Sequence, residues 1–258
     1  MDYPTLLTTL REAGIENAAG EARLLLEHFE GEALSDAIAK RLSHYPLQYL
    51  LGEWGFYREE YEVSPDCLIP RPDTECLVEL AVKHLPKGAR FLDLCTGSGC
   101  IAISTLAARK DTSALAVDLF EGTLALAGRN AKRNGVAERL QLEKADVLAD
   151  PPPTLSEERF DAILSNPPYI RSDVVKTLSP ELAFEPAAAL DGGEDGLAFY
   201  RAILTHWTLL LKEDGFVLFE IGFDQADALN ALAPLYGFTS TVFRDLGGND
   251  RVTLLKKT

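Results

Sequence analysis

The stretch "RFLDLCTGSGCIAI", Arg90 to Ile103, joins two apolar segments through a short glycine loop. The first segment, at residues 89–94, is short and mostly apolar, which predicts a buried strand. Gly97 and Gly99 allow the backbone to turn tightly and to approach a ligand closely. Residues 99–110 predict a helix. A strand, a glycine turn and a helix are typical of a sheet that binds ligands beyond the carboxyl ends of its strands.

The same alternation continues through the rest of the chain. Short apolar segments that predict strands follow at residues 114–119, 140–146, 160–166 and 215–222. Segments with helical spacing accompany them at residues 122–135, 197–215 and 223–237. Residues 238–257 contain two strands without a helix between them, so these two must pair antiparallel. We therefore expect a doubly wound, Rossmann-like α/β fold, with a mostly parallel sheet and an antiparallel last strand.

The front of the chain does not follow this pattern. Leucines at helical spacing and glycine stop signals in residues 1–48 predict a small helical bundle. Residues 49–70 are rich in aromatic side chains and alternate apolar with polar positions, which predicts a hairpin-like connector. We expect the sheet domain to span residues 71–258, and Asp73 or Thr74 to cap its first helix.

The composition limits the classes of protein to which this chain can belong. The 258 residues include 40 acidic and 25 basic side chains, a net charge of -15. Such a chain gains little from neutralising phosphates, so we expect no direct nucleic-acid partner. Its four cysteines lack the paired spacing of a zinc site, so we expect no metal. The chain shows neither a signal peptide nor a membrane-length apolar run, so we expect a cytoplasmic protein without membrane association.

An acidic residue, Asp93, precedes the glycine loop. Its carboxylate would repel the pyrophosphate of a dinucleotide, whereas it suits the ammonium group of S-adenosylmethionine. The pattern therefore favours S-adenosylmethionine over a nicotinamide dinucleotide. The residues that we expect to bind this cofactor here are Asp93, Cys95, Thr96, Gly97, Ser98 and Gly99.

Two further acidic residues follow strands of the predicted sheet. Asp118 ends the second strand, 25 residues after Asp93, where an acidic residue commonly binds the ribose hydroxyls. Its alternative role is that of a strand-end cap. Asp146 follows the third strand, and its carboxylate is placed to accept from an adenine amino group while Val147 packs near the ring. The alternative for Asp146 is an ordinary turn aspartate.

The fourth strand ends in "SNPPYI", which places Asn166 beside the glycine loop. A planar nitrogen is a weak nucleophile, because its lone pair is delocalised. The Asn166 side-chain carbonyl and the Pro167 backbone carbonyl can accept from its two N–H groups, while Pro167 and Pro168 fix the backbone. Tyr169 can supply a flat wall for a planar group. The motif predicts a clamp for an NH2 group but does not distinguish a nucleobase from an amide.

Several quoted segments together resemble one known family. "PLQYLLGEWGFYREEYEVSPDCLIPRPDTECLVE", "LDLCTGSGCIAI", "SNPPYI", "FEPAAALDGGEDGL", "LFEIGFDQ" and "DRVTLLKK" are similar to the peptide chain release factor glutamine methyltransferases. The resemblance implies methylation of the side-chain nitrogen (N5) of the glutamine in the Gly-Gly-Gln motif of release factors. It implies S-adenosylmethionine as the methyl donor and S-adenosylhomocysteine as the product. It also implies release factors as the protein partner. We expect the protein itself to be a monomer.

The resemblance assigns roles to particular residues. It implies that Asn166 to Tyr169 hold the glutamine, and that the Cys95–Gly99 loop, Asp118 and Asn166 contact the cofactor. It implies that Arg71 and Glu75 line the mouth of the active site and that the helical front binds the release factor.

One position departs from the family pattern, because Cys95 stands where family loops often have glycine. We expect a contact rather than a reactive thiol, since Asp93 should raise the pKa of Cys95. Glu185 and Glu220 are read as loop anchors or strand-end caps rather than as site-lining acids. Three alternatives stay open: a ribosomal-protein glutamine methyltransferase, a methyltransferase acting on nucleic-acid amino groups, and a cofactor-binding scaffold without activity.

Overall fold

The computed structural model describes residues 1–258, and its centre is a seven-stranded sheet of order β5-β4-β3-β6-β7-β9-β8. The strands are β3 (Arg90–Leu94), β4 (Ser113–Asp118), β5 (Leu140–Lys144), β6 (Phe160–Ser165), β7 (Leu211–Glu220), β8 (Phe238–Arg244) and β9 (Asp250–Lys257). Strands β3 to β7 pair parallel, whereas β9 runs antiparallel to both β7 and β8. The expected doubly wound sheet with an antiparallel last strand is confirmed.

The chain changes direction across the sheet at β3. From this strand it proceeds to β4 and β5 on one side, and then crosses to β6 and β7 on the other. The carboxyl ends of β3 and β6 are therefore neighbours at a topological switch point. A crevice opens at such a point, and ligands of open α/β sheets bind there.

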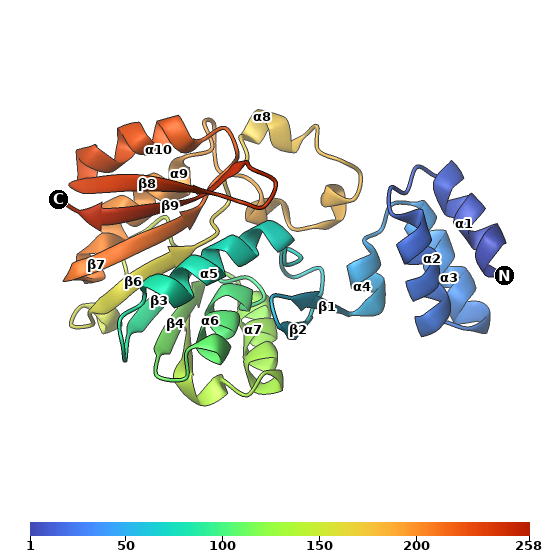
Figure 1. Ribbon diagram of the computed structural model, residues 1–258, viewed down its shortest axis with the longest axis horizontal. Helices are drawn as coiled ribbons and strands as arrows, with labels where there is room; N and C mark the ends of the chain where they lie inside the picture. The colour runs from blue at the N-terminus through green and yellow to red at the C-terminus, as the bar shows by residue number, and fades with distance from the viewer.

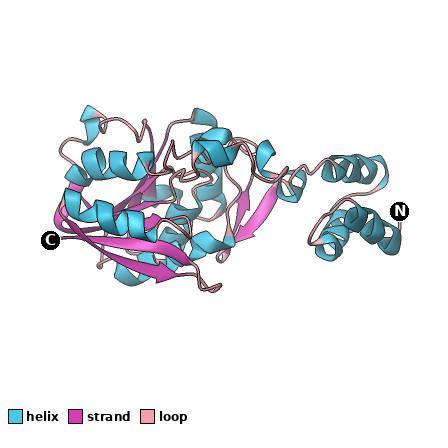
Figure 2. Cartoon of the chain, turned by 90° about the horizontal axis from the view of Figure 1, so that it is seen from above, coloured by secondary structure: helices cyan, strands magenta, loops and turns pink.

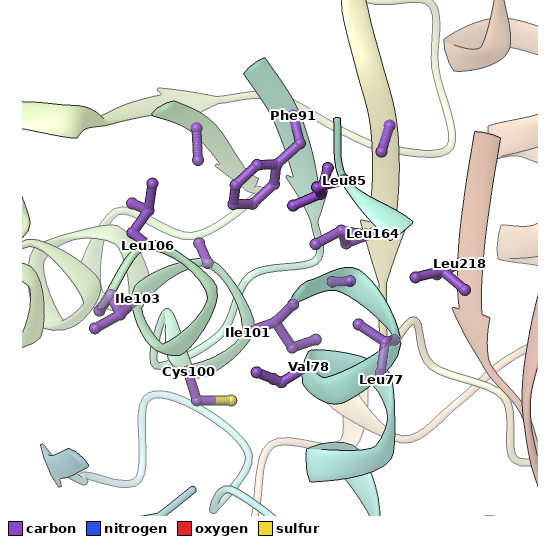
Figure 3. Packing of buried hydrophobic residues seen from close by; sticks show 14 of the residues in the cluster. Leu77, Val78, Leu85, Phe91, Cys100, Ile101, Ile103, Leu106, Leu164 and Leu218 are labelled. Atoms are coloured by element: carbon purple, nitrogen blue, oxygen red, sulfur yellow. The ribbon is translucent and has the colours of Figure 1, made fainter. Parts of the chain in front are cut away.

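Helices cover both faces of the sheet (Figure 1). One face packs against α5 (Glu75–His84), α6 (Cys100–Ala108) and α7 (Glu121–Arg133); the other packs against α9 (Ala198–Ala202) and α10 (Ala226–Leu232). Along each strand, alternate residues pack into the two apolar cores on opposite faces of the sheet. Figure 3 shows Phe91, Leu164 and Leu218 of three strands meeting α5 and α6. Their neighbours Leu92, Ile163 and Val217 face the other way.

The helix predicted at residues 197–215 is wrong at its carboxyl end. After α9, wider turns over Ile203–Trp207 and tighter ones over Thr208–Leu210 lead directly into β7. The strand begins at Leu211, which is buried and pairs with Phe160 of β6. The leucine run of this segment continues a helical pattern, but pairing with β6 overrides that local preference.

The front of the chain forms a separate group of helices, α1 (Tyr3–Glu12), α2 (Ala18–His28) and α3 (Gly31–Leu42), with its own apolar core. Figures 1 and 2 both show this bundle set to one side of the sheet. None of the helices is long and apolar enough to cross a membrane. The division of the chain at residues 48 and 70 stays a prediction.

Between the bundle and the sheet lie α4 (Leu47–Leu51) and a hairpin of β1 (Glu53–Phe56) and β2 (Glu59–Glu62). The hairpin was expected, but the short helix α4 was not. Phe56 and Tyr61 of the hairpin belong to the same buried core as α5 and α6. The hairpin is therefore packed on the sheet domain, and its turn is held at a fixed place near the start of α5.

Candidate active site

A cavity of about 470 Å³ lies at the carboxyl ends of β3, β4 and β6. Ten of the residues predicted for the site line it: Arg71, Cys95, Thr96, Gly97, Ser98, Asp118, Asp146, Val147, Asn166 and Pro168. Five predicted residues lie outside the lining: Glu75, Asp93, Gly99, Pro167 and Tyr169. The sheet thus brings together residues that are far apart in the sequence, as the strand-end pattern indicates.

The loop between β3 and α6 makes three left-handed backbone turns, at Cys95 (φ 60°), Gly97 (φ 56°) and Gly99 (φ 83°). Glycine adopts this conformation freely, whereas Cys95 must hold a strained one at the position where family loops often have glycine. A Cβ on Gly97 would meet no atom within 4 Å, so this glycine faces open space in the cavity. A Cβ on Gly99 would meet Ala127 of α7 at 3.2 Å, so this glycine lets the loop and α7 pack closely.

Asp93 lies beneath the loop, because it shares the face of β3 that α6 covers. It is fully buried, and its Oδ2 accepts from Thr96 Oγ1 at 2.6 Å and from the Ala102 backbone N–H at 3.2 Å. Its Oδ1 is buried without a partner. Burial raises the pKa of Asp93 to about 7, although the two hydrogen bonds oppose the rise. In this structure, Asp93 anchors the loop from below instead of facing the cavity.

Asp118 holds the loop from the side. Its Oδ2 accepts from the Gly97 backbone N–H at 3.1 Å, and its Oδ1 accepts from the Phe120 N–H at 3.2 Å. Burial raises the pKa of Asp118, and these backbone hydrogen bonds oppose the rise. Burial also raises the pKa of the Cys95 thiol well above its usual range, with Asp118 and then Asp93 adding to it. The expected direction for Cys95 is confirmed, but burial is a larger cause than Asp93.

The far end of the cavity carries exposed apolar side chains that the sequence analysis did not identify. Leu119, Phe120 and Leu148 line the cavity and are 44%, 48% and 46% exposed. Asp146 lies beside them, where its Oδ1 accepts from the Leu148 N–H at 2.9 Å. Val147 is buried, and its carbonyl accepts from the Trp207 indole N–H. These apolar groups offer a surface on which a flat ring can lie.

Asn166 directly follows β6, and its side chain has a defined partner. Its Nδ2 donates to Thr74 Oγ1 across 3.2 Å, and its Oδ1 accepts no hydrogen bond from the protein. Thr74 is buried and lines the cavity. It stands at the N-cap position of α5, as one of the two predicted caps, but its side chain makes no capping hydrogen bond. Its hydroxyl oxygen instead accepts the hydrogen bond from the Asn166 side chain.

Comparisons with known proteins identify the family of this chain. Residues 73–193 match the family model described as methyltransferase small domain. Release factor glutamine methyltransferases of Geobacter sulfurreducens and Cereibacter sphaeroides are 37% and 39% identical, over 94% of this chain and 91% and 92% of theirs. The chain belongs to the release factor glutamine methyltransferase family. A solved methyltransferase from Pyrococcus furiosus has the same fold, with a TM-score of 0.57 at 21% identity over 76% of this chain and 87% of that one.

Two segments on which the resemblance to the release factor glutamine methyltransferase family rests meet at the mouth of the cavity. Arg71, from "IPRPDTE", forms an ion pair with Glu185, from "FEPAAALDGGEDGL". The other carboxylate oxygen of Glu185 accepts from the Ile69 backbone N–H at 2.9 Å. Burial raises the pKa of Glu185, while Arg71 opposes the rise. Glu185 therefore anchors the two loops to one another, as the sequence analysis expected.

The structure places Glu75 away from the cavity. Its Oε1 accepts from the Tyr57 backbone N–H at 2.9 Å, and Tyr57 stands in the left-handed region with φ 58°. Glu75 follows the 3₁₀ turn Pro72–Thr74 and is already the first residue of α5. The helix turns it toward the hairpin, so in this structure Glu75 stabilises the hairpin turn and does not line the mouth.

The glycines of residues 191–196 bring a second loop onto the Asn-Pro-Pro-Tyr segment, a contact that the sequence analysis missed. A Cβ on Gly192 would meet Pro168 O at 2.8 Å, and one on Gly196 would meet Tyr169 O at 2.4 Å. Gln225 Nε2 donates to the carbonyls of both Tyr169 and Gly196 at 3.1 Å. The signal in the sequence was three glycines within five residues, which indicates a close approach of two backbones.

Proposed function

We propose that this protein transfers a methyl group from S-adenosylmethionine to the side-chain nitrogen of the glutamine in the Gly-Gly-Gln motif of peptide chain release factors. The observation that carries the proposal is the unpaired Oδ1 of Asn166, held in a cavity beside a glycine loop by the bond from Nδ2 to Thr74. The names of the family relatives support the substrate.

The residues of the cavity fit S-adenosylmethionine. The open space above Gly97 leaves room for a ligand to lie against the backbone, and a Cβ there would fill part of it. Asp118 keeps lone pairs for ribose hydroxyls, because each of its oxygens accepts only one backbone hydrogen bond of 3.1–3.2 Å. Leu119, Phe120 and Leu148 would flank the adenine. When bound, the cofactor supplies a methyl group on a positively charged sulfur.

The protein's own contribution is to orient the glutamine amide. The Oδ1 of Asn166 would accept from one amide N–H, and the backbone carbonyl of Pro167 would accept from the other. Both acceptors move electron density toward the nitrogen and restrict its direction of attack. Orientation of this kind accounts for as much as about 7–11 kcal/mol of a barrier. No general base is required before the transfer, because the nitrogen loses its proton after the new C–N bond has formed.

The charge of the chain favours a protein substrate over a nucleic acid. With a net charge of -15, the protein as a whole repels the phosphates of a nucleic acid. A ribosomal-protein glutamine requires the same chemistry, so the choice between the two protein substrates rests on the family relatives. We assign binding of the release factor to the helical front of the chain.

The test uses the full-length protein with methyl-labelled S-adenosylmethionine. It is incubated separately with a release factor, with the same factor carrying Gly-Gly-Ala in place of Gly-Gly-Gln, with a ribosomal protein and with duplex DNA. Label on the intact release factor alone is the expected result. Label on the ribosomal protein or the DNA would mean that the same clamp acts on another substrate than the proposed one.

A further inference from the structure

One buried glutamine beside the Asn-Pro-Pro-Tyr segment has no role in the function described so far. Gln225 comes from "LFEIGFDQ", in the turn between β7 and α10, and it is 9% exposed. Its side-chain Nε2 donates to the backbone carbonyls of Tyr169 and Gly196, both at 3.1 Å. Its Oε1 accepts from the Gly222 N–H at 2.9 Å and from the Tyr200 hydroxyl at 3.3 Å. Both donor and both acceptor positions of the amide are therefore used within the protein.

The partners settle which way this amide faces. A backbone carbonyl can only accept, so Nε2 must lie toward Tyr169 and Gly196. A backbone N–H can only donate, so Oε1 must lie toward Gly222. The turn also holds the side chain from behind, because the Gln225 N–H donates to the Gly222 carbonyl at 3.0 Å. The Gln225 side chain is thus oriented by the protein itself.

Two glycines leave the space that the Gln225 side chain occupies. A Cβ on Gly196 would meet Gln225 Nε2 at 2.8 Å and the Tyr169 carbonyl oxygen at 2.4 Å. A Cβ on Gly222 would meet Gln225 Oε1 at 3.2 Å. The backbones of three segments, the Asn-Pro-Pro-Tyr segment, the loop of residues 191–196 and the turn of residues 222–225, therefore meet around one amide group.

The Asn-Pro-Pro-Tyr segment is the proposed clamp for the glutamine amide. Pro167 and Pro168 have no N–H, so the usual pairing with a neighbouring strand cannot fix this stretch. Its first end is fixed because Asn166 directly follows β6. Its other end is fixed at the Tyr169 carbonyl, which accepts from Gln225. No backbone N–H of the protein donates to the Pro167 carbonyl between these ends, so that carbonyl stays available to a substrate.

We propose that Gln225 is a positioning residue for methyl transfer, which holds the Tyr169 carbonyl so that the clamp keeps the shape that orients the substrate amide. The inference rests on the proposed function of the Asn-Pro-Pro-Tyr segment. Gln225 does not line the cavity, so it acts through its partners instead of touching the substrate. The same amide fixes Gly196, which ends the loop whose Asp191 and Gly193 do line the cavity.

The experiment compares Gln225→Glu and Gln225→Met with wild type in the release-factor methylation assay. A glutamate side chain has at most one proton to donate, so it cannot hold both carbonyls, and methionine holds neither. We expect both variants to lower kcat on the order of 10- to 100-fold, because a misplacement of about 1 Å is enough for such a loss. The KM for S-adenosylmethionine should stay within about threefold of wild type, since Gln225 contacts neither the glycine loop nor Asp118.

A matched control separates positioning from general stability. Arg139 also joins several backbone carbonyls at 2.8–3.1 Å, those of Leu106, Arg109 and Thr112. Thr112 directly precedes β4, so this junction lies at the amino ends of the strands, away from the cavity. Arg139→Met should lower the free energy of unfolding and leave kcat at the wild-type value. A wild-type kcat for both Gln225 variants, or an equal loss of kcat in Arg139→Met, would overturn the proposal.

A second readout does not depend on the substrate. Ile170 follows the held carbonyl, and its N–H donates to the Leu190 carbonyl at 3.0 Å, while its own carbonyl accepts from the Gly192 N–H at 2.8 Å. Hydrogen exchange of these two N–H groups, followed by NMR, should be at least about tenfold faster in both Gln225 variants than in wild type and in Arg139→Met.

The two readouts distinguish the failure of the substrate from the failure of the inference. If wild type methylates no release factor while the difference in hydrogen exchange holds, the proposed substrate is wrong and the anchoring by Gln225 stands. Equal exchange in all four proteins would refute the anchoring itself.

Discussion

Arg41 of the helical bundle lies 2.5 Å from Glu181, a residue of the loop that follows the Asn-Pro-Pro-Tyr segment. The guanidinium is 2% exposed and also binds Glu21 of α2, which is 13% exposed, whereas Glu181 is 43% exposed. Hydrogen bonds to the two acids raise the pKa of Arg41, although burial opposes the rise. One buried cation thus connects the front bundle to a loop of the catalytic half.

The exposure of the two acids predicts unequal costs of removing them. Glu21→Gln leaves a buried guanidinium without its best partner, and we expect a loss of about 2–4 kcal/mol of unfolding free energy. Glu181→Gln removes a solvent-screened partner, and we expect a loss below about 1 kcal/mol. Urea denaturation of both variants measures the difference. Equal losses would show that the contact with Glu181 is as strong as the pair within the bundle.

The strained backbone at Cys95 predicts that glycine is more stable than alanine at this position, which reverses the usual order of stability. At an ordinary position, Gly is less stable than Ala by about 0.5–1 kcal/mol. At φ 60° the Cβ is unfavourable, so Cys95→Gly should be more stable than Cys95→Ala by about 1 kcal/mol. Both variants lose the same thiol, so the difference between their unfolding free energies reports the backbone strain. Thermal unfolding of the pair is the measurement, and a more stable alanine variant would contradict the assigned strain.

Asn166→Ala tests the acceptor directly. Removing one preorganised hydrogen-bond partner should lower kcat by about 10²–10³-fold. The affinity for S-adenosylmethionine should stay within a few-fold of wild type, because Asp118 and the glycine loop provide the other proposed contacts. Turnover in the methylation assay and calorimetry with the cofactor give the two numbers. Near-normal turnover would exclude Asn166 from the clamp.

Much of this arrangement could be predicted from local sequence patterns. Strands β3 to β6 were found because short apolar runs alternate with helical ones, and Asn166 and Asp118 were found because they end such strands. Thr74 was expected only as one of two possible helix caps, so its hydrogen bond with Asn166 was missed. The hydrogen bond between Asn166 and Thr74 depends on bringing the end of β6 next to the start of α5, which no local pattern contains.

Two other differences have the same physical origin. Glu75 is four residues from Arg71 and was assigned to the same mouth, but the beginning of α5 turns it toward the Tyr57 turn. The segment after residue 207 keeps a helical pattern of leucines, but Leu211 pairs with Phe160 and becomes strand. In both cases a tertiary contact decided between conformations that the local sequence allows.

Substitutions of Asp118 and Asp146 give a matched comparison that tests cofactor binding. Asp118 is half-buried and bonded to the Gly97 N–H, so Asp118→Ala removes a proposed ribose acceptor and loosens the loop. Asp146 is exposed and bonded only within its own turn, to Leu148. We expect calorimetry to show the larger loss of S-adenosylmethionine affinity for Asp118→Ala, by at least about tenfold, as for one hydrogen bond to a charged group. Equal affinity of Asp118→Ala and wild type would remove the ribose assignment.

Asp93 predicts a pH dependence of stability. Its folded pKa of about 7 lies above the ordinary value of 3.8, so its contribution is complete below pH 4 and is lost as pH rises toward 7. Between those limits the unfolded chain has released a proton that the folded chain keeps. Asp93→Asn should therefore gain about 1–3 kcal/mol of unfolding free energy relative to wild type between pH 5 and pH 8. Denaturation of both proteins at the two pH values measures the gain. A constant difference would mean that Asp93 is already ionised at pH 5, and that the partners of Oδ2 outweigh its burial.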